Sequence, residues 1–336
     1  MTTPAPDPLS VPVGPPPPFD PELAPALRMI NEVLPPDAFG DPAGISKLRD
    51  GSTGMEAVLL EDLSRDGAFT VEERTVPGPQ GAPEISLLIC RPVTVRAPVP
   101  VIYHTHGGGM VIGNNRSGLP GVLDLAETVE AAVVSVEYRL APETPHPGPV
   151  EDCYAGLLWT AEHADELGLD AGRVIVAGGS AGGGLAAALA IMARDRGGPA
   201  LFAQMLMCPM IDDRNDTPSA LQMAGRGVWD RASNQGGWTA LLGEARGTDA
   251  VSPYAAPARA TDLSGLPPAF IDVGSAETFR DEDVTYASRL WQAGGSAELH
   301  VWSGGFHGFD GMVPQAVLSQ DARVARARWL RRILSA

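Results

Sequence analysis

The chain has 336 residues, of which 44% are hydrophobic, so it can bury a full core and fits one large α/β domain with a subdomain. Its formal net charge is -17 at pH 7, from 24 Lys and Arg against 41 Asp and Glu. Proteins that bind nucleic acid or an anionic membrane need clustered Lys and Arg, so this composition argues against both classes of partner.

The cysteine content and the first residues of the chain predict the cellular compartment of the protein. Cys90, Cys153 and Cys208 are odd in number and widely spaced, which predicts reduced thiols rather than a disulfide framework or a zinc site. Residues 1–8 lack the basic start and apolar run of a secretory signal. No stretch approaches the roughly 18 apolar residues that a membrane helix needs. We therefore expect a cytoplasmic protein with no membrane partner.

The N-terminal region is expected to lie outside the main sheet. Proline dominates residues 1–18, a composition that favours extended polyproline and cannot bury a core, so a disordered arm is expected. Residues 20–34 carry leucine and isoleucine at steps of three and four, which predicts an amphipathic helix, and a second helix is expected over residues 55–66. Residues 19–66 are interpreted as cap helices over an active-site mouth, with a plain structural arm as the alternative.

Apolar runs and helical segments alternate through the rest of the chain. Strands are predicted over residues 68–76, 84–91, 99–105, 131–138, 174–177, 269–273 and 298–302, and helices over residues 151–167, 181–194 and 281–293. Apolar strands interleaved with helices indicate a mostly parallel sheet covered on both faces. The predicted fold class is therefore α/β, with a catalytic domain from residue 67 to residue 336.

The strand and helix rhythm breaks between Cys208 and Leu263. This polar segment contains Trp229 and Trp238. Insertions of this kind commonly lie over the carboxyl ends of strands, where ligands bind. We expect residues 209–263 to form the second part of the cap and both tryptophans to shape the substrate pocket.

A lone serine stands between glycines where the strand 174–177 turns into an alanine-rich helix. A turn this sharp forces Ser180 toward positive φ, and Gly178 and Gly182 leave room for backbone that passes close by. The pattern matches the G-x-S-x-G elbow, which exposes a nucleophilic serine at the top of a sheet. A dinucleotide loop fails in register, because Ser180 falls where G-x-G-x-x-G needs its second glycine. A helix start that uses glycine only for close packing is the other alternative.

Residues 106–109, His-Gly-Gly-Gly, directly follow the strand 99–105. Three glycines leave several N–H groups free to converge on a developing oxyanion, where each such donor contributes about 2.7–4 kcal/mol. This loop type is the known partner of the serine elbow, and a flexible glycine turn is the alternative. His104 and His106 also form an H-x-H pattern, but the absence of a neighbouring cysteine or carboxylate in the sequence favours no metal site.

A nucleophilic serine needs a base, which is best supplied by His307. His307 lies in a glycine-rich loop just past the last strand, whereas His146, His163 and His300 fit structural roles. The base in turn needs a carboxylate, and the stretch after the preceding strand offers Asp272, Glu277, Asp281, Glu282 and Asp283. Spacing alone does not choose among them. Asp272 falls in the strand and residues 281–283 in the first turn of a helix, which leaves Glu277 in the loop.

From about residue 70 to its end, the chain resembles the bacterial hormone-sensitive-lipase-like esterases of the α/β-hydrolase superfamily. The matching motifs occur in the family's order: His106-Gly-Gly-Gly109, Tyr138-Arg-Leu-Ala-Pro-Glu143, Gly178-Gly-Ser-Ala-Gly-Gly183, Arg280-Asp-Glu282 and His307-Gly-Phe309. The family implies an α/β-hydrolase fold, a Ser-acid-His triad and an α-helical cap. Carried over, the resemblance implies Ser180 and His307 as triad members, and the amides of Gly108, Gly109 and Ala181 as the oxyanion hole.

Two positions depart from the family's pattern. Gly179 stands where the family usually has Asp before the nucleophile, and Glu277 stands where the catalytic Asp begins an Asp-Pro-Leu-x-Asp-Glu pattern. Glutamate can serve if the backbone retreats by about one methylene, so we prefer Glu277 to Asp281 as the acid. Asp152 precedes Ser180 in the chain and is expected to cap a helix start.

These patterns and the resemblance predict a serine carboxylesterase that needs no cofactor. The resemblance implies small esters with short acyl chains as substrates; a small-molecule ester is thus the expected partner, nucleic acid is not, and a homodimer stays open. The alternatives are a lactone, carbamate or amide hydrolase on the same machinery, or a non-catalytic small-molecule binding protein on a hydrolase fold. The last case normally has a broken triad, whereas this sequence keeps both Ser180 and His307.

Overall fold

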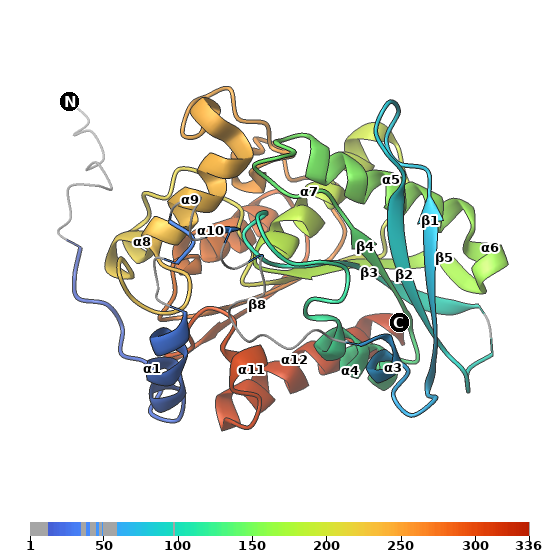
Figure 1. Ribbon diagram of the computed structural model, residues 1–336, viewed down its shortest axis with the longest axis horizontal. Coiled ribbons are helices and arrows are strands. Elements are labelled where there is room, and N and C mark those ends of the chain that lie inside the picture. The colour runs from blue at the N-terminus through green and yellow to red at the C-terminus, as the bar shows by residue number, and fades with distance from the viewer. Residues whose placement is uncertain are drawn as a thin grey trace.

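The computed structural model describes residues 13–34, 38–40, 45, 46, 49, 59–96 and 98–335. An eight-stranded sheet runs through the middle of this part of the chain, with helices on both faces (Figure 1). The strand order is β1-β2-β4-β3-β5-β6-β7-β8. Only the pairs β1/β2 and β2/β4 are antiparallel, so the predicted mostly parallel sheet is confirmed.

Most strands agree closely with the predicted ranges, but β5 is longer than the predicted 174–177 and one strand is additional. They are β1 (Phe69–Val76), β2 (Ile85–Pro92), β3 (Val99–Thr105), β4 (Ala132–Glu137), β5 (Leu169–Gly179), β6 (Ala203–Met207), β7 (Ala269–Gly274) and β8 (Ala297–Trp302). Strand β6 was not predicted, because its sequence of Ala, Gln, Met and Leu carries no β-branched residue. It lies between β5 and β7 and thus completes the parallel half of the sheet.

The helices include two that the sequence analysis did not identify, α4 and α12. The helices are α1 (Leu23–Val33), α3 (Leu60–Leu63), α4 (Leu119–Val129), α5 (Gly148–Glu162), α6 (Ala164–Leu167), α7 (Ala181–Arg196), α8 (Pro218–Gln222), α9 (Arg231–Leu242), α10 (Arg280–Gln292), α11 (Phe309–Met312) and α12 (Val317–Leu334), with short 3-10 turns at Gly243–Ala245 and Pro257–Arg259. The helix expected over residues 55–66 is represented by α3, and its residues 55–58 lie outside the described residues. So do residues 1–12 of the predicted arm, and residues 13–20 form neither helix nor strand.

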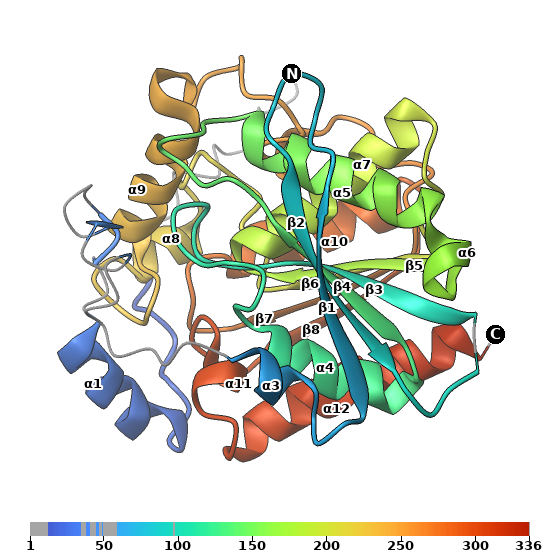
Figure 2. The same cartoon turned by 45° about the vertical axis from the view of Figure 1, so that its right-hand side comes forward.

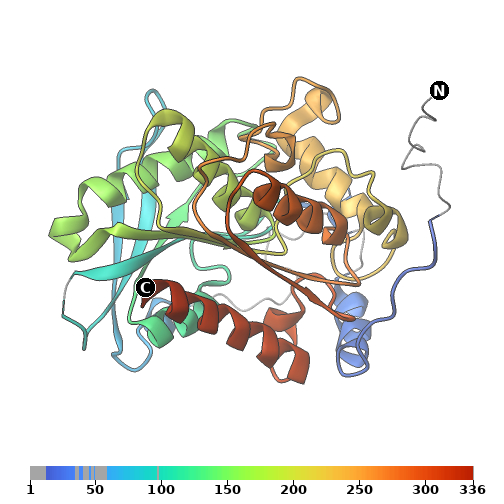
Figure 3. The same cartoon turned by 180° about the vertical axis from the view of Figure 1, so that it is seen from behind.

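The sheet separates two hydrophobic cores, because successive side chains of a strand point to opposite faces. On β3, Val101 and Tyr103 pack into the core beneath α5, α7 and α10, whereas Ile102 packs into the core beneath α4 and α12. Figures 2 and 3 show these two helical layers on either side of the strands. Strand β5 lies in the middle of the sheet, between the two helical layers. Ser180 follows directly at its carboxyl end.

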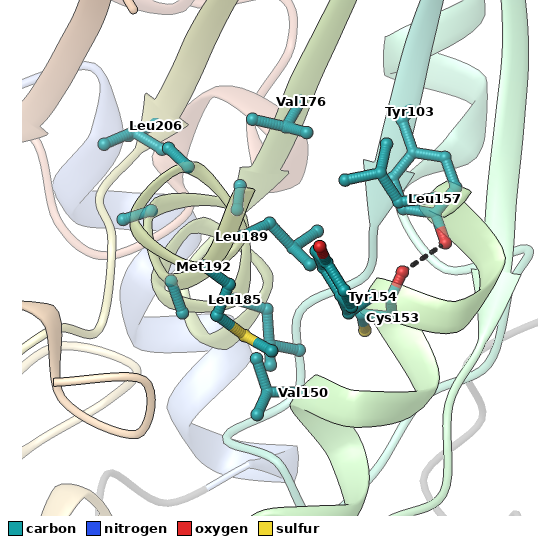
Figure 4. Packing of buried hydrophobic residues seen from close by; sticks show 14 of the residues in the cluster. Tyr103, Val150, Cys153, Tyr154, Leu157, Val176, Leu185, Leu189, Met192 and Leu206 are labelled. Atoms are coloured by element: carbon teal, nitrogen blue, oxygen red, sulfur yellow. Dashed lines mark hydrogen bonds between the residues drawn. The ribbon is translucent and has the colours of Figure 1, made fainter. Parts of the chain in front are cut away.

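Helix α7 lies close to the sheet because its buried face is built largely from glycine and alanine. A Cβ atom on Gly184 would lie 2.1 Å from the carbonyl oxygen of Met210, so only glycine fits there. Leu185, Leu189 and Met192 fill the space between α7 and α5 (Figure 4). Truncating such a buried leucine to alanine typically costs about 2–5 kcal/mol of unfolding free energy. This packing fixes the start of α7, and with it the serine turn.

Helices from two distant parts of the chain gather on one side of the molecule. Figure 1 shows α1, α8 and α9 on the same side, away from α6. Leu23 and Leu27 of α1 pack with Phe306 and Phe309, which flank the glycine-rich loop of His307. Helices α8 and α9 belong to the 209–263 insertion. A cap made of residues 19–66 and 209–263 stays a prediction. Within the described residues, none of the helices is long and apolar enough to cross a membrane.

Candidate active site

Ser180 sits at the junction of β5 and α7 with φ 58° and ψ -125°. A serine held at positive φ stores about 1–3 kcal/mol of strain, which surrounding packing must offset. The flanking glycines permit this turn: a Cβ on Gly178 would lie 2.4 Å from the carbonyl of Gly182, and one on Gly182 would lie 2.0 Å from the carbonyl oxygen of Thr105. The tight strand-turn-helix geometry expected around Ser180 is therefore present.

The side chains of Ser180, His307 and Glu277 form one continuous hydrogen-bonded chain. His307 Nε2 lies 2.9 Å from Ser180 Oγ, and His307 Nδ1 lies 3.0 Å from Glu277 Oε1. His307 is 8% exposed and Glu277 is 2% exposed. With an ionised Glu277, His307 carries its proton on Nδ1 and presents the free lone pair of Nε2 to the serine hydroxyl.

Glu277 is held in place from the other side by the backbone at the end of β7. Its second oxygen, Oε2, accepts the amide of Gly274 at 3.1 Å. The next residue, Thr278, donates its hydroxyl to the carbonyl of Trp229 at 2.7 Å. The phenyl ring of Phe279 packs edge-on against the imidazole of His307, with 5.1 Å between the two ring centroids. The loop after β7 therefore fixes both the carboxylate and the plane of the imidazole.

The other four carboxylates of this region point elsewhere. Asp281 accepts the amide of Ser219 and pairs with Arg280. Glu282 accepts the amides of Ile211 and Asp212. Asp272 lies in β7, as expected, and pairs with Arg326, whereas Asp283 is fully buried and its oxygens have no hydrogen-bond partner among the described residues. Burial raises the pKa of the carboxyl of Asp283 well above its usual range.

The expectation for Asp152 is wrong. Asp152 lies inside α5 rather than at its N-cap, which is Pro147. Its carboxylate accepts the backbone amide and both guanidinium donors of Arg139. Because a buried carboxylate needs a charged, hydrogen-bonding partner, this pairing takes the place of the capping role.

The glycine loop after β3 lies directly beside the serine. Gly108 and Gly109 have φ of +118° and +61°. A Cβ on Gly107 would lie 3.5 Å from Ser180 Cβ, so this loop passes immediately over the serine turn. Among the described residues, the amides of Gly108 and Gly109 have no acceptor. Ala181 is the first residue of α7, where helix geometry also leaves an N–H without an intrahelical acceptor.

His104 and His106 are part of the scaffold under this loop. The imidazole of His106 stacks on the ring of Tyr138 with 4.1 Å between the ring centroids, and its Nδ1 lies 2.8 Å from the carbonyl oxygen of Gly107. His104 Nδ1 lies 2.9 Å from Ser135 Oγ. Burial lowers the pKa of His104 to about 3 and that of His106 to about 4, so both are neutral at pH 7.

Trp229 and Trp238 differ in their relation to the site. The ring of Trp229 lies against the glycine loop, since a Cβ on Gly109 would lie 2.2 Å from its Cη2 atom, and its centroid is 6.4 Å from that of His307. The side chain of Trp238 is 0% exposed and belongs to the hydrophobic core. Neither tryptophan lines the cavity that contains Ser180. The role in the substrate pocket expected of both tryptophans stays a prediction.

That cavity has a volume of about 870 Å³. Its inner end is formed by Ser180, His307 and the glycine loop, and it continues between α4 on one side and α11 and α12 on the other. Figure 1 shows α4, α11 and α12 side by side along one edge of the molecule, and α4 and α12 are in contact. A volume of this order accommodates a drug-sized molecule, so the serine is reached through a pocket large enough for an ester with extended arms.

Cys208 was not identified as a site residue from the sequence, yet its thiol lies beside the hydrogen-bonded chain. Its Sγ and ligand atoms of Glu277 and His307 all lie within 4.8 Å of one another, a cluster of donors that could hold a soft metal ion. Burial, reinforced by carboxylates such as Glu277, raises the pKa of the Cys208 thiol well above its usual value. A thiol that stays neutral adds no charge beside Glu277 and His307.

A buried arginine anchors the loop that carries His307. Arg326 of α12 donates to Asp272 of β7 at 2.9 Å and pairs with Asp310, which lies three residues after His307. Although burial opposes ionisation, the charge of Arg326 lowers the pKa of Asp310. Removing one partner of a buried pair typically costs about 3–5 kcal/mol, so this network stiffens the loop that carries His307.

Comparison with known proteins places the chain among esterases. A protein-family model described as alpha/beta hydrolase fold matches residues 102–311. Carboxylesterase NlhH of Mycobacterium tuberculosis is 37% identical over 294 residues, which cover 86% of this chain and 89% of that protein. Esterase LipI of the same species is 37% identical, over 78% of this chain and 84% of LipI.

Solved structures agree with these relatives. A bacterial heroin esterase superposes with a TM-score of 0.87 at 42% identity, covering 94% of this chain and 98% of that one. Esterase LipW from Mycobacterium marinum gives a TM-score of 0.81 at 32% identity, over 91% and 100% of the two chains. The predicted resemblance to hormone-sensitive-lipase-like esterases is thereby confirmed, and the chain belongs to the alpha/beta hydrolase family.

Proposed function

We propose that this protein is a serine carboxylesterase in which Ser180 is the nucleophile, His307 the general base and Glu277 the acid of the triad. The observation that carries the proposal is the unbroken hydrogen-bonded chain from Ser180 Oγ through both ring nitrogens of His307 to Glu277 Oε1. Its relatives, named carboxylesterase and esterase, support ester hydrolysis as the reaction. The arrangement has the roles and geometry of a Ser-His-acid triad.

Acylation begins when an ester carbonyl lies above Ser180. His307 Nε2 takes the hydroxyl proton as Oγ attacks the carbonyl carbon, and the resulting imidazolium is stabilised by the carboxylate of Glu277. The tetrahedral intermediate then collapses, and His307 gives this proton to the departing alcohol. Water repeats the sequence against the acyl-enzyme: His307 removes a proton from the water, releases the acid and restores the serine hydroxyl.

The negative charge of each tetrahedral intermediate falls on the former carbonyl oxygen. We assign its stabilisation to the amides of Gly108, Gly109 and Ala181, which lie on either side of the serine and are not committed to acceptors within the described fold. Preorganised donors of this kind contribute about 2.7–4 kcal/mol each. Glycine at 108 and 109 permits the positive φ values that this loop requires.

The experiment is a panel of p-nitrophenyl esters of graded acyl length, measured with the wild-type protein, Ser180→Ala and Ser264→Ala. Ser264 is an exposed serine outside the site and serves as the matched control. We expect Ser180→Ala to fold normally and to lose about 10⁴–10⁶-fold in kcat, whereas Ser264→Ala retains wild-type activity. Activity of Ser180→Ala within tenfold of the wild type would overturn the assignment of the nucleophile.

The same panel also separates the neighbouring reaction classes. Lactones, carbamates and amides present the same carbonyl to the same nucleophile, so their inclusion shows which leaving groups are released. A wild-type protein that binds esters but hydrolyses none would instead indicate a non-catalytic binding protein. We expect the shortest p-nitrophenyl acyl chains to give the highest kcat/KM among unsubstituted esters.

A further inference from the structure

Arginines gather along one wall of the cavity that contains Ser180. Helix α12 contributes Arg323, Arg328 and Arg331 to this wall, in addition to the buried Arg326. None of these three arginines has an ion-pair partner in the described part of the chain. Arg323 donates only to the carbonyl of Asp310 and Arg331 only to the carbonyl of Thr128. Arg328 and Arg331 in particular have no carboxylate partner among the described residues, so their positive charge is available to a ligand in the cavity.

The carboxylates that line the same cavity offset the charge of these arginines only in part. Asp124 is paired with Arg65, and Asp310 is paired with Arg326, although the charge of Arg323 also helps to lower the pKa of Asp310. The chain as a whole carries a net charge of -17, so a cationic wall at this place contrasts with the rest of the composition. A cleft with one sign of charge focuses its field on the ligand that enters it.

The arginines are spread along the cavity rather than gathered at one point. Arg323 donates to the carbonyl of Asp310, which lies three residues after His307. Arg331 instead donates to the carbonyl of Thr128, near the end of α4. The eight steps along the helix from residue 323 to residue 331 span about 12 Å. Leu125, Val324 and Ala327 give the intervening wall an apolar surface. An ester bound at Ser180 would thus extend an apolar arm past successive guanidinium groups.

We propose that the substrates of this enzyme are esters that carry a carboxylate on one arm, such as half-esters of dicarboxylic acids. The inference rests on the proposed esterase function and names the substrate class of that same site. A guanidinium group presents a planar fork of N–H donors that matches a carboxylate in geometry and charge. Water adds across the acyl–oxygen bond, so the products are an alcohol and a carboxylic acid, one of which keeps the original carboxylate.

The test compares isosteric pairs of esters that differ only in charge. For the acyl arm, the pair is the p-nitrophenyl half-ester of adipic acid and the same ester with a terminal carboxamide. For the alcohol arm, it is 6-acetoxyhexanoate and 6-acetoxyhexanamide, followed by acid release at constant pH. We expect kcat/KM to favour the carboxylate in at least one pair by about tenfold, which corresponds to 1.4 kcal/mol.

The variants are Arg323→Gln, Arg328→Gln and the double variant, with Arg332→Gln as the matched control. Arg332 lies on the same helix, pairs with Glu298 and does not line the cavity. The carboxylate-to-carboxamide ratio should fall toward one in the double variant and stay at its wild-type value in Arg332→Gln. Raising the salt concentration should also reduce the wild-type ratio, because charges at an open cavity wall are screened.

The outcomes separate this inference from the proposed function. If the wild-type protein hydrolyses p-nitrophenyl acetate but shows no preference for the carboxylate in either pair, the inference is wrong and the esterase assignment stands. The inference is equally overturned if the preference survives in the double variant or is lost in Arg332→Gln. If the wild-type protein hydrolyses no ester of either charge, the proposed function itself fails.

Discussion

Oε1 of Glu277 lies 3.0 Å from Nδ1 of His307, while Oε2 of the same carboxylate accepts the amide of Gly274. Both oxygens of Glu277 are thus engaged, one by His307 and one by the backbone at the end of β7. Four residues later, Asp281 is bound to Ser219 and Arg280 instead. This division between two neighbouring carboxylates leads directly to the first prediction.

The first prediction compares Glu277→Gln with Asp281→Asn. Loss of the carboxylate at 277 removes the partner that fixes the tautomer of His307 and stabilises the imidazolium, so we expect kcat to fall by about 10⁴-fold. Loss of the charge at 281 weakens the first turn of α10, and we expect at most about 1 kcal/mol of lost stability. Steady-state kinetics and thermal melts of both variants provide the measurement. An inactive Asn variant beside an active Gln variant would assign the acid to Asp281.

The second prediction concerns Gly108→Ala. The new Cβ would lie 2.1 Å from the carbonyl oxygen of Ile112, and φ at this position is +118°, so the loop must shift. We expect a loss of about 10²–10³-fold in kcat, the size typical of one missing oxyanion donor. Binding of a ground-state ester analogue should change much less. Equal losses in kcat and in analogue binding, accompanied by a lower melting temperature, would indicate loop misfolding instead.

The third prediction separates the two tryptophans. Trp238→Ala empties a fully buried position, so we expect a loss of about 3–5 kcal/mol in unfolding free energy. Trp229 is also buried in the same hydrophobic core, but its ring packs on Gly109 beside His307, so we expect Trp229→Ala to change kcat and acyl-length preference in addition to lowering stability. Urea unfolding and the p-nitrophenyl ester panel measure the two effects. The reverse pattern would contradict the placement of these side chains.

The fourth prediction uses the buried carboxyl of Asp283. Burial raises its pKa in the folded state, so the ionised carboxylate opposes folding, and the resulting loss of stability grows as the pH rises from the unfolded-state pKa toward the raised folded-state pKa. Below the unfolded-state pKa of about 3.9, Asp283 is protonated in both states and the cost is absent. Replacement by the neutral Asn should therefore stabilise the protein at pH 8, by about 1–3 kcal/mol, and stabilise it less as the pH falls.

Unfolding free energies of the wild-type protein and Asp283→Asn, measured in urea between pH 5 and pH 8, check this expectation. The sign of the difference in unfolding free energy is the informative result, because removal of a well-paired carboxylate would destabilise the protein over the same pH range. A variant that is less stable than the wild type at pH 8, or a difference that does not vary with pH, would refute the account of Asp283.

Much of the fold follows from local sequence patterns. The strand runs and the glycines around Ser180 carry their conformation in a few neighbouring residues, so their positions could be predicted. Strand β6 and helix α12 could not, since Ala-Gln-Met-Leu-Met has no strand signature and the arginines of α12 obscure its apolar face. Tertiary contacts with β5, β7 and α4 determine these elements instead.

Local sequence patterns also predicted only part of the candidate site. The motifs indicated Ser180, His307 and the glycine loop, whose chemistry depends on spacing along the chain. Nothing local distinguishes Trp229, which lies on the loop, from Trp238, which is sealed in the core. The place of Cys208 beside Glu277 likewise depends on the pairing of β6 with β7, which the sequence analysis did not foresee.

The central claim is that Ser180 forms the covalent intermediate. The most direct measurement is peptide mass spectrometry after stoichiometric inactivation by a p-nitrophenyl organophosphate, which leaves a stable phosphoryl group on an activated serine. We predict one phosphoryl group per chain, on the peptide that contains Ser180, with its appearance matching the loss of esterase activity. Complete inactivation with the label on another residue, or full activity after Ser180 is labelled, would contradict the account.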